Sequence, residues 1–326
     1  MNQPAVVANE SSIEQAHEII EALIDNIETV MYGKREVIQL CIVGLLARGH
    51  LLIEDIPGIG KTTLAQALAL SIDCDFNRVQ FTSDMLPADI LGVSIINPST
   101  REFDFRKGPV FANIVLADEI NRTPPKTQSA LLEAMSESHV TTDGITRQLP
   151  SPFMVLATQN PIEYEGTYTL PEAQLDRFLL RISIGYPGGD DELRIMRRHD
   201  PQPLLDAIKP NLTGSDVKTL QAISQQIRIE DSVAAYMLAI VQATREHPDI
   251  RLGASPRASL ALYESCQAYA LVQGRDYVTP GDVKTLAPPV MCHRIIAKSH
   301  GGNRVATTHE REMVMKEILN TVPVPA

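Results

Sequence analysis

Phosphate-binding chemistry is indicated by a glycine-rich segment that follows an apolar run. The segment, LIEDIPGIGKTT at 52–63, ends in a glycine, a lysine and two threonines. Backbone N–H groups in such a loop, at the positive end of the next helix, can bind a β-phosphate. The lysine would place a point charge at the β- and γ-phosphates, and the threonine hydroxyl would be a ligand for Mg²⁺. We expect the nucleotide contacts to come from Pro57, Gly58, Ile59, Gly60, Lys61, Thr62 and Thr63.

One position departs from the usual P-loop pattern, because Asp55 stands where the first glycine is expected. A carboxylate that faced the phosphates would repel them. Asp55 must therefore point away from the loop if the loop binds nucleotide. Taken alone, the segment favours a phosphate site and a structural turn about equally.

A second motif further along the chain, NIVLADEINR, supports the interpretation of the loop as a phosphate-binding site. Four apolar residues lead directly to Asp118 and Glu119, as at the end of a buried strand. Asp118 would hold the hydration shell of Mg²⁺, and Glu119 would polarise an attacking water. An acidic helix cap is the structural alternative. The two motifs together indicate hydrolysis of a nucleoside triphosphate.

The elements that would position these residues form an α/β pattern up to about residue 185. Five short apolar runs (HLLIE, RVQFT, NIVLAD, FMVLAT and LLRISI) are separated by helical patterns or loops, which is typical of a parallel sheet covered on both faces. Two helices are expected before and beside the first run, over 11–31 and 34–47. Asp143-Gly144 predicts a β-hairpin turn.

A helical domain is expected after GYPGGDD at 185–191, where the strand pattern stops. The helices are predicted over 191–199, 214–228, 232–246, 257–273, 280–290 and 309–320. The predicted organisation is a nucleotide-binding core over 1–190 and an all-α domain over 191–326.

Composition limits the function classes. The 326 residues include 29 Lys and Arg against 40 Asp and Glu, a net charge of −11 that opposes general binding to nucleic acid. The four cysteines are far apart without a CxxC pair, so a zinc knuckle or disulfide framework has little support. No apolar run is long enough to span a bilayer, and the N-terminus lacks a signal-peptide pattern, so a cytoplasmic location is expected.

Two longer stretches resemble the MoxR branch of the AAA+ ATPases. They are RKGPVFANIVLADEINRTPPKTQSALLEAMSESHVTTDG and VLATQNPIEYEGTYTLPEAQLDRFLLRI, and the similarity is dense over about residues 30–185 and looser through GASPRASLAL. The resemblance implies an AAA+ P-loop NTPase with an αβα core, a parallel sheet and a small all-α lid domain. It also implies that ATP and Mg²⁺ are bound and that a residue other than glycine is tolerated at position 55.

The resemblance assigns roles to three polar residues outside the two motifs. Asn160 in ATQNP matches sensor 1, the residue that senses the γ-phosphate and positions the catalytic water. The alternative is a structural role for Asn160 in a turn before Pro161. Arg177 in QLDRF matches the arginine finger that an adjacent subunit receives, with Arg181 as the spare candidate. Arg257 in GASPRA matches sensor 2, projecting from the lid onto the nucleotide.

The remaining assignments are weaker. The segment VMYGKR resembles the strip beside the adenine, with Tyr32 and Gly33 near the base, although packing is the more frequent role of such an aromatic. Gln80 in RVQFT is expected to restrain Glu119 in the resting state.

Two inserted stretches are candidates for contacts with other proteins. ILGVSIINPSTREFDFRKG resembles the helix 2 insert of this clade, and IEYEGTYTLPEAQ carries Tyr164 and Tyr168. Packing of these tyrosines at a subunit interface is the structural alternative.

The predicted function is ATP hydrolysis by a ring, expected to be a hexamer, that remodels or matures protein clients, with partners that carry a von Willebrand A domain. A chelatase motor subunit and a nucleotide-gated scaffold with little turnover are the alternatives. A DNA-remodelling motor is disfavoured by the acidic balance and by the lack of a DNA-reading module.

Overall fold

A five-stranded parallel sheet forms the centre of the molecule. The computed structural model describes residues 10–160, 167–198, 202–298 and 307–325. The strand order is β2-β5-β8-β1-β9, so the first strand in sequence lies between the last two. The five predicted runs are confirmed as strands: β1 Leu51–Glu54, β2 Phe76–Gln80, β5 Ile114–Asp118, β8 Met154–Gln159 and β9 Leu180–Ile182.

Alternate residues of each central strand enter two different hydrophobic clusters. Leu51 and Ile53 of β1 belong to one cluster, and Leu52 belongs to the other. Because both faces of the sheet are covered, the strands are apolar at nearly every position. Three helices pack on the first face: α1 Glu10–Glu28, α2 Arg35–Leu46 and α3 Lys61–Ser71. Two cover the other: α4 Pro87–Leu91 and α5 Pro125–Glu137.

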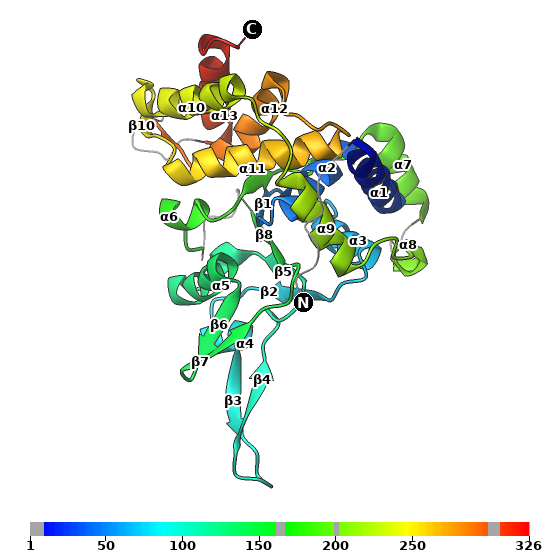
Figure 1. Ribbon diagram of the computed structural model, residues 1–326. Coiled ribbons are helices and arrows are strands. Elements are labelled where there is room, and N and C mark those ends of the chain that lie inside the picture. Colours follow the sequence, from blue (N-terminus) through cyan, green and yellow to red (C-terminus); the bar gives the residue numbers. More distant parts are fainter. Residues whose placement is uncertain (1–9, 161–166, 199–201, 299–306, 326) are drawn as a thin grey trace.

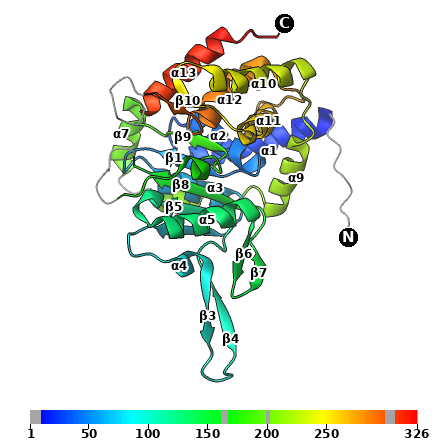
Figure 2. The ribbon, with the colours of Figure 1, turned by 90° about the vertical axis from the view of Figure 1, so that its left-hand side faces the viewer.

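Two antiparallel hairpins extend from the core at the end away from the lid (Figures 1 and 2). One pairs β3 Gly92–Ile96 with β4 Phe103–Lys107, and the other pairs β6 His139–Thr142 with β7 Ile145–Gln148. The predicted turn at Asp143-Gly144 is confirmed, since both residues have positive φ, 54° and 73°. The Ser94 hydroxyl donates to Asp143 at 2.6 Å, which ties the hairpins together.

The C-terminal part is helical, as predicted. Its helices are α9 Gly214–Ser224, α10 Asp231–Glu246, α11 Pro256–Val272, α12 Pro280–Met291 and α13 Thr308–Thr321, and α7 Gly189–Arg198 and α8 Gln202–Ala207 precede them. Threonine capping boxes begin α9, α12 and α13. One short antiparallel pair, β10 Ile250–Leu252 with β11 Ile296–Ala297, was not signalled by the sequence, because two or three residues are too few to show a period.

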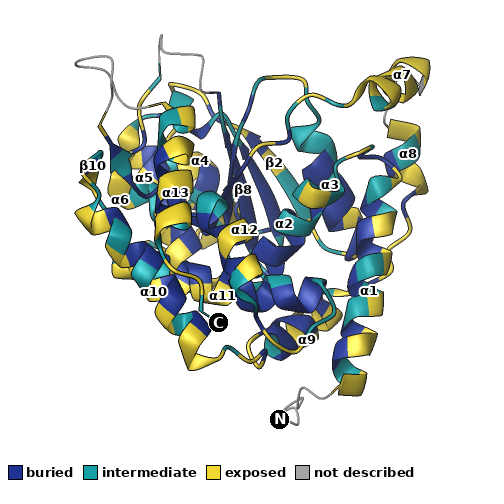
Figure 3. Ribbon diagram, turned by 90° about the horizontal axis from the view of Figure 1, so that it is seen from above, coloured by how far each residue is buried: buried dark blue, intermediate teal, exposed yellow. Residues whose placement is uncertain are grey.

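The lid is seated on the N-terminal helices. A single buried cluster continues from the sheet through α2 into α11 and α12, visible as dark blue ribbon in Figure 3. Two polar contacts lie at this junction: Gln221 of α9 donates to the Leu45 carbonyl at 2.7 Å, and the His17 ring nitrogen lies 3.0 Å from the Val272 carbonyl. Within the described ranges, no helix has the length and apolar content needed to cross a bilayer.

Candidate functional site

The glycine-rich loop between β1 and α3 has the backbone geometry of an anion cradle. Gly58 and Gly60 have φ of +83° and +96°, a region that side chains disfavour. A Cβ added to Gly58 would meet nothing within 4 Å, so the loop is open at that point. Gly60 is the N-cap of the 11-residue helix α3 and makes no side-chain cap hydrogen bond, so the positive end of this helix faces the loop. The N–H groups of its first turn are placed to bind an anion.

The Asp55 carboxylate points away from this cradle, as the sequence argument required. Its Oδ2 accepts hydrogen bonds from the backbone N–H groups of Ile184 at 2.6 Å and Gly185 at 2.8 Å, and from the Ser183 hydroxyl at 3.0 Å. The residue is only 8% exposed. The charge is therefore satisfied at the segment after β9, and the objection to a phosphate site is removed.

Lys61 lies back along the loop. Its ammonium donates to the Asp55 carbonyl at 2.7 Å. Met31 borders the same loop, because its sulfur is 3.4 Å from the position that a Cβ on Gly60 would take. The structure therefore brings the segment at 31–33 beside the loop, where the sequence placed it.

The α7 helix packs against that segment. A Cβ on Gly33, whose φ is +64°, would lie 2.1 Å from an Asp191 carboxylate oxygen, and the Arg194 guanidinium lies 5.8 Å from the centre of the Tyr32 ring. Tyr32 and Gly33 thus line a wall between the loop and α7. Their contact with an adenine base stays a prediction.

The first carboxylate of the second motif ends its strand at the same edge of the sheet as the loop. Both β1 and β5 pair with β8: Glu54 is level with Gln159, and Ala117 is level with Ala157. The loop and Asp118 are thus separated laterally by two strand spacings, about 10 Å. They lie at the same edge of the sheet, where the carboxyl ends of the strands meet.

The Asp118 carboxylate is paired with the guanidinium of Arg78 in the structure. The Arg78 guanidinium lies 2.6 Å from one carboxylate oxygen, and the Thr158 hydroxyl donates to the other at 2.7 Å. A carboxylate and the Thr62 hydroxyl are the oxygen ligands that Mg²⁺ prefers. The environment of Asp118 accommodates a positive charge, because it holds the Arg78 guanidinium in the structure. Asp118 and Thr62 therefore fit a magnesium site.

Glu119 has a strained backbone conformation. Its φ of 58° lies in the left-handed region, which costs a non-glycine residue about 1–3 kcal/mol. Gln80 donates to its Oε2 at 2.8 Å, so the expected contact is present, and the Arg122 Nε lies 2.9 Å from the same oxygen. That this contact restrains Glu119 in a resting state stays a prediction. The Glu119 N–H donates to the Thr158 hydroxyl at 2.9 Å. The same threonine therefore fixes both acidic residues.

Sequence reasoning missed Arg78, Arg122 and Thr158. Arg78 precedes Gln80 by two positions on β2, so both side chains lie on the same face of the strand. This signal becomes useful only once β2 is known to pair with β5. The role of Thr158 likewise depends on the position of β8 beside β5.

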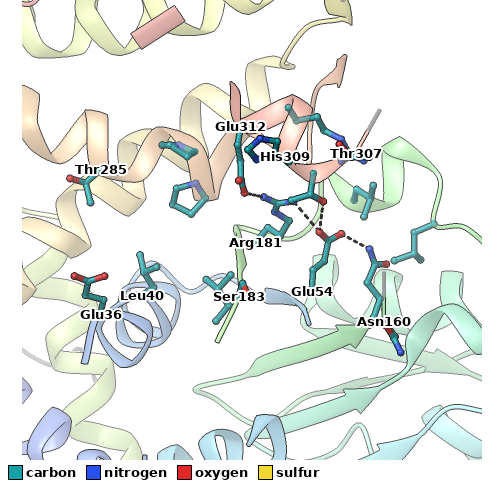
Figure 4. A pocket seen from close by; sticks show the side chains of 18 of the residues that line it. Glu36, Leu40, Glu54, Asn160, Arg181, Ser183, Thr285, Thr307, His309 and Glu312 are labelled. Atoms are coloured by element: carbon teal, nitrogen blue, oxygen red, sulfur yellow. Dashed lines mark hydrogen bonds and ion pairs between the residues drawn. The ribbon is translucent and has the colours of Figure 1, made fainter. Parts of the chain in front are cut away.

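Asn160 follows β8 directly and is 8% exposed. It lines a cavity of about 1230 Å³ between the carboxyl edge of the sheet and the lid (Figure 4). Leu40 of α2 and Thr307 before α13 line the same cavity. Asn160 therefore lies at the carboxyl edge of the sheet beside the lid, and its role as a sensor of the nucleotide stays a prediction.

The position of Arg181 argues against a role at a neighbouring subunit. Its side chain is 7% exposed and pairs with Glu54 at 2.9 Å and with Glu312 of α13 at 2.7 Å. Figure 4 shows the three side chains pointing toward one another inside the cavity. Arg177, which follows α6 Glu172–Leu175, is only half-buried and stays the candidate arginine finger.

Arg257 lies close to the Arg177 segment. It is exposed in the first turn of α11, and Ser255 immediately before that helix donates to Asp176 at 3.0 Å. In Figure 1, α6 lies beneath the N-terminal end of α11. The role of Arg257 over the nucleotide stays a prediction.

The insert predictions fall partly inside the described chain. Tyr164 lies outside the described residues. Tyr168 is 42% exposed, and its backbone N–H donates to the Asn121 carbonyl at 2.6 Å. The helix 2 insert stretch forms the β3–β4 hairpin, with Ile96 60% and Phe103 72% exposed.

Comparison with known proteins agrees with this geometry. Residues 50–180 match the model of the ATPase family associated with various cellular activities (AAA), and residues 242–314 match the AAA lid domain. The chain is 49% identical to the uncharacterized protein YeaC of Bacillus subtilis, covering 96% of this chain and 97% of that protein. It is 41% identical to Chaperone MoxR1 of Mycobacterium tuberculosis, covering 94% and 82%.

Solved structures extend the comparison. A crystal structure of a proposed ATPase from Cytophaga hutchinsonii aligns with a TM-score of 0.88 at 37% identity, over 97% of this chain and 98% of that one. An MCM homolog from Methanopyrus kandleri aligns with a TM-score of 0.55 at 16% identity, a likeness of fold alone.

Proposed function

Since the chain belongs to the MoxR family of AAA+ ATPases, we propose that it binds ATP at the glycine-rich loop and hydrolyses the bond between the β- and γ-phosphates. A water oxygen would bond to the γ-phosphorus, the bond to the bridging oxygen would break, and ADP and phosphate would leave. The observation that carries this proposal is the convergence of the loop and Asp118 on one edge of the sheet.

The roles of the residues follow from their chemistry. Lys61 would attract the β- and γ-phosphate oxygens, and Glu119 would orient the attacking water. Mg²⁺, held by Thr62 and Asp118, would supply positive charge at the phosphate oxygens. Asn160 would position the water from the neighbouring strand.

The pairs in the structure describe a resting arrangement. Asp118 must exchange Arg78 for the metal, and Glu119 must leave Gln80 and Arg122 before it can act as a base. These exchanges would make turnover conditional on the binding of nucleotide and magnesium. They also favour the alternative of a nucleotide-gated scaffold, which would keep the resting pairs and hydrolyse little ATP.

Phosphate release from the concentrated protein distinguishes these functions. We expect wild type to release phosphate, Glu119→Gln to retain ATP with turnover reduced at least about 100-fold, and Lys61→Ala to lose nucleotide binding. If wild type released no phosphate, and Glu119→Gln released no less than wild type, the scaffold would be supported instead.

We propose further that the subunits form a ring, expected to be a hexamer, in which Arg177 completes the adjacent site. Its half-exposed side chain supports this. Sedimentation of Glu119→Gln with ATP should show a species several times the monomer mass. A monomer at all ATP and protein concentrations would contradict the ring.

The work of the ring would be to remodel or mature a protein client, and a von Willebrand A domain partner is expected from the resemblance. The exposed apolar pair Ile96 and Phe103 supports the β3–β4 hairpin as a client contact. A photo-crosslinking amino acid at position 103 should capture a protein in a nucleotide-dependent way. The matched control at Leu260, exposed on α11, should not; equal capture from both positions would contradict this assignment.

A further inference from the structure

A buried arginine of the lid, Arg294, forms hydrogen bonds to the core segment that contains Arg177. Arg294 follows α12, and its guanidinium donates to the carbonyls of Phe178 at 2.7 Å, Leu179 at 3.3 Å and Val290 at 2.7 Å. Its Nε lies 3.0 Å from an Asp176 carboxylate oxygen. Burial lowers the pKa of Arg294 to about 10, so the group stays charged at neutral pH. A buried charge with these partners is costly to disturb.

Two more lid residues hold the same segment. The His293 Nε2 lies 2.9 Å from the Phe178 carbonyl, and burial together with the adjacent Arg294 charge keeps the pKa of His293 well below its usual value. The neutral ring therefore donates this hydrogen bond. Ser255, two positions before Arg257, donates to the second Asp176 oxygen at 3.0 Å.

Ser255, His293 and Arg294, together with Asp176, form what we call the bracket. It fixes residues on both sides of Arg177, because Asp176 and Phe178 are its sequence neighbours. The Arg177 backbone cannot shift relative to the lid without breaking hydrogen bonds to a buried guanidinium. The Arg177 side chain itself is left half-exposed.

We propose that the bracket positions Arg177, so that the lid and the arginine finger of one subunit move as one unit. The proposal rests on the proposed role of Arg177 at the adjacent site. Movement of the lid in one subunit would then advance or withdraw the cation that its neighbour needs. Ser255, Asp176, His293 and Arg294 are positioning residues in this scheme, since they reach the reaction only through Arg177.

The variant for the test must keep the fold. Removal of Arg294 would leave several buried carbonyls unpaired, so we choose the double variant Asp176→Asn with Ser255→Ala, which keeps those hydrogen bonds. Because it removes the carboxylate beside a buried guanidinium, thermal unfolding must first show that the variant is folded at the assay temperature. The Asp176 side chain is 21% exposed, and both replacements are small. Gln221→Leu, which removes a lid–core hydrogen bond away from Arg177, is the matched control for general loosening of the lid.

Alone, the double variant should lose at least about 10-fold in kcat for ATP with KM within about two-fold, while Gln221→Leu keeps wild-type kcat. Mixing tests whether the defect lies in the finger. Rings that combine the double variant with Glu119→Gln subunits should regain activity, because the intact sites of the double variant receive Arg177 from the partner. Mixing with Arg177→Ala subunits should restore nothing.

The outcomes separate this inference from the proposed function. A first control mixes Arg177→Ala subunits with Glu119→Gln subunits, and ATP hydrolysis should return if Arg177 acts at the adjacent site. Given that result, the role of the bracket would be overturned by a wild-type kcat in the double variant. It would also be overturned if Glu119→Gln subunits did not restore the kcat that the double variant loses. If Arg177→Ala is not restored either, the assignment of Arg177 to the adjacent site is wrong, and the bracket proposal falls with it.

Discussion

The Asp55 carboxylate lies 2.6 Å from the backbone nitrogen of Ile184 and accepts its hydrogen bond. This contact joins the start of the nucleotide loop to the segment that leads from β9 toward the lid. The Gly185 N–H adds a second bond at 2.8 Å. Where the common loop pattern has a glycine, this chain has a carboxylate that anchors the loop to the segment after β9.

Replacement of Asp55 by the glycine of the common pattern should therefore harm the protein. We expect Asp55→Gly to lower the free energy of unfolding by about 2–4 kcal/mol, because two backbone N–H groups lose an ionised acceptor. Asp55→Asn should lose less, since an amide oxygen can accept one bond. Urea unfolding measures both, with Asp206→Asn on the surface as the control, expected within about 0.5 kcal/mol of wild type. Unchanged stability in Asp55→Gly would contradict the anchor.

Arg78 should compete with magnesium for Asp118. Arg78→Ala should lower the Mg²⁺ concentration for half-maximal ATP hydrolysis about five-fold, as expected when a half-exposed ion pair worth about 1 kcal/mol is removed. A magnesium titration of phosphate release measures this. The matched control is Arg101→Ala in the exposed β3–β4 turn, which should leave the titration unchanged. A higher magnesium requirement in Arg78→Ala would show that Arg78 assists the site instead.

Arg177 and Arg181 should respond differently to truncation. Arg181→Ala should cost about 3–5 kcal/mol of stability, because it breaks the ion pair between this buried guanidinium and the half-buried Glu54. Arg177→Ala should change stability by less than about 1 kcal/mol but slow turnover about 10³-fold with ATP binding retained. Thermal unfolding and phosphate release separate the two effects. Wild-type turnover in Arg177→Ala would mean that no neighbour supplies this cation.

His50 should make the fold sensitive to acid. Its Nδ1 accepts from the Val155 N–H at 3.0 Å and its Nε2 lies 3.0 Å from the Met135 carbonyl, so only the neutral ring satisfies both contacts. Burial lowers its pKa from 6.5 to about 4. The unfolded chain therefore binds this proton first as pH falls. The stabilisation is complete above about pH 6.5 and is lost toward pH 4, by up to about 3 kcal/mol.

Urea unfolding at pH 7.5 and pH 4.5 tests the role of His50. His50→Gln should lose less stability between these pH values than wild type does. Some loss should persist, because the pKa of His293 is lowered in the same direction. The same loss in both proteins would mean that His50 is not the acid-sensitive group.

The strands and the loop were predictable because their signals are local. Leu51–Glu54 and Ile114–Asp118 are apolar runs that end at chemically distinctive residues, and a parallel sheet brings such ends to one edge. The orientation of Asp55 away from the loop also followed, since a carboxylate repels phosphate.

Contacts between distant segments were not predictable in this way. The Arg78–Asp118 pair depends on β2 lying beside β5, and the Arg294–Phe178 contact depends on how the lid sits on the core. The β3–β4 hairpin was also missed as a hairpin. Its two strands are largely exposed and do not pack on a hydrophobic core, so their sequences lack the alternation of apolar and polar residues that predicts a strand.

A structure of Glu119→Gln with ATP and magnesium tests the central claim most directly. We expect the β-phosphate at the backbone N–H groups of residues 58–62, the metal at the Thr62 hydroxyl and beside Asp118, and Arg78 withdrawn from that carboxylate. ATP bound elsewhere, or Asp118 still paired with Arg78 and without a metal beside it, would contradict the claim that loop and carboxylate serve one nucleotide.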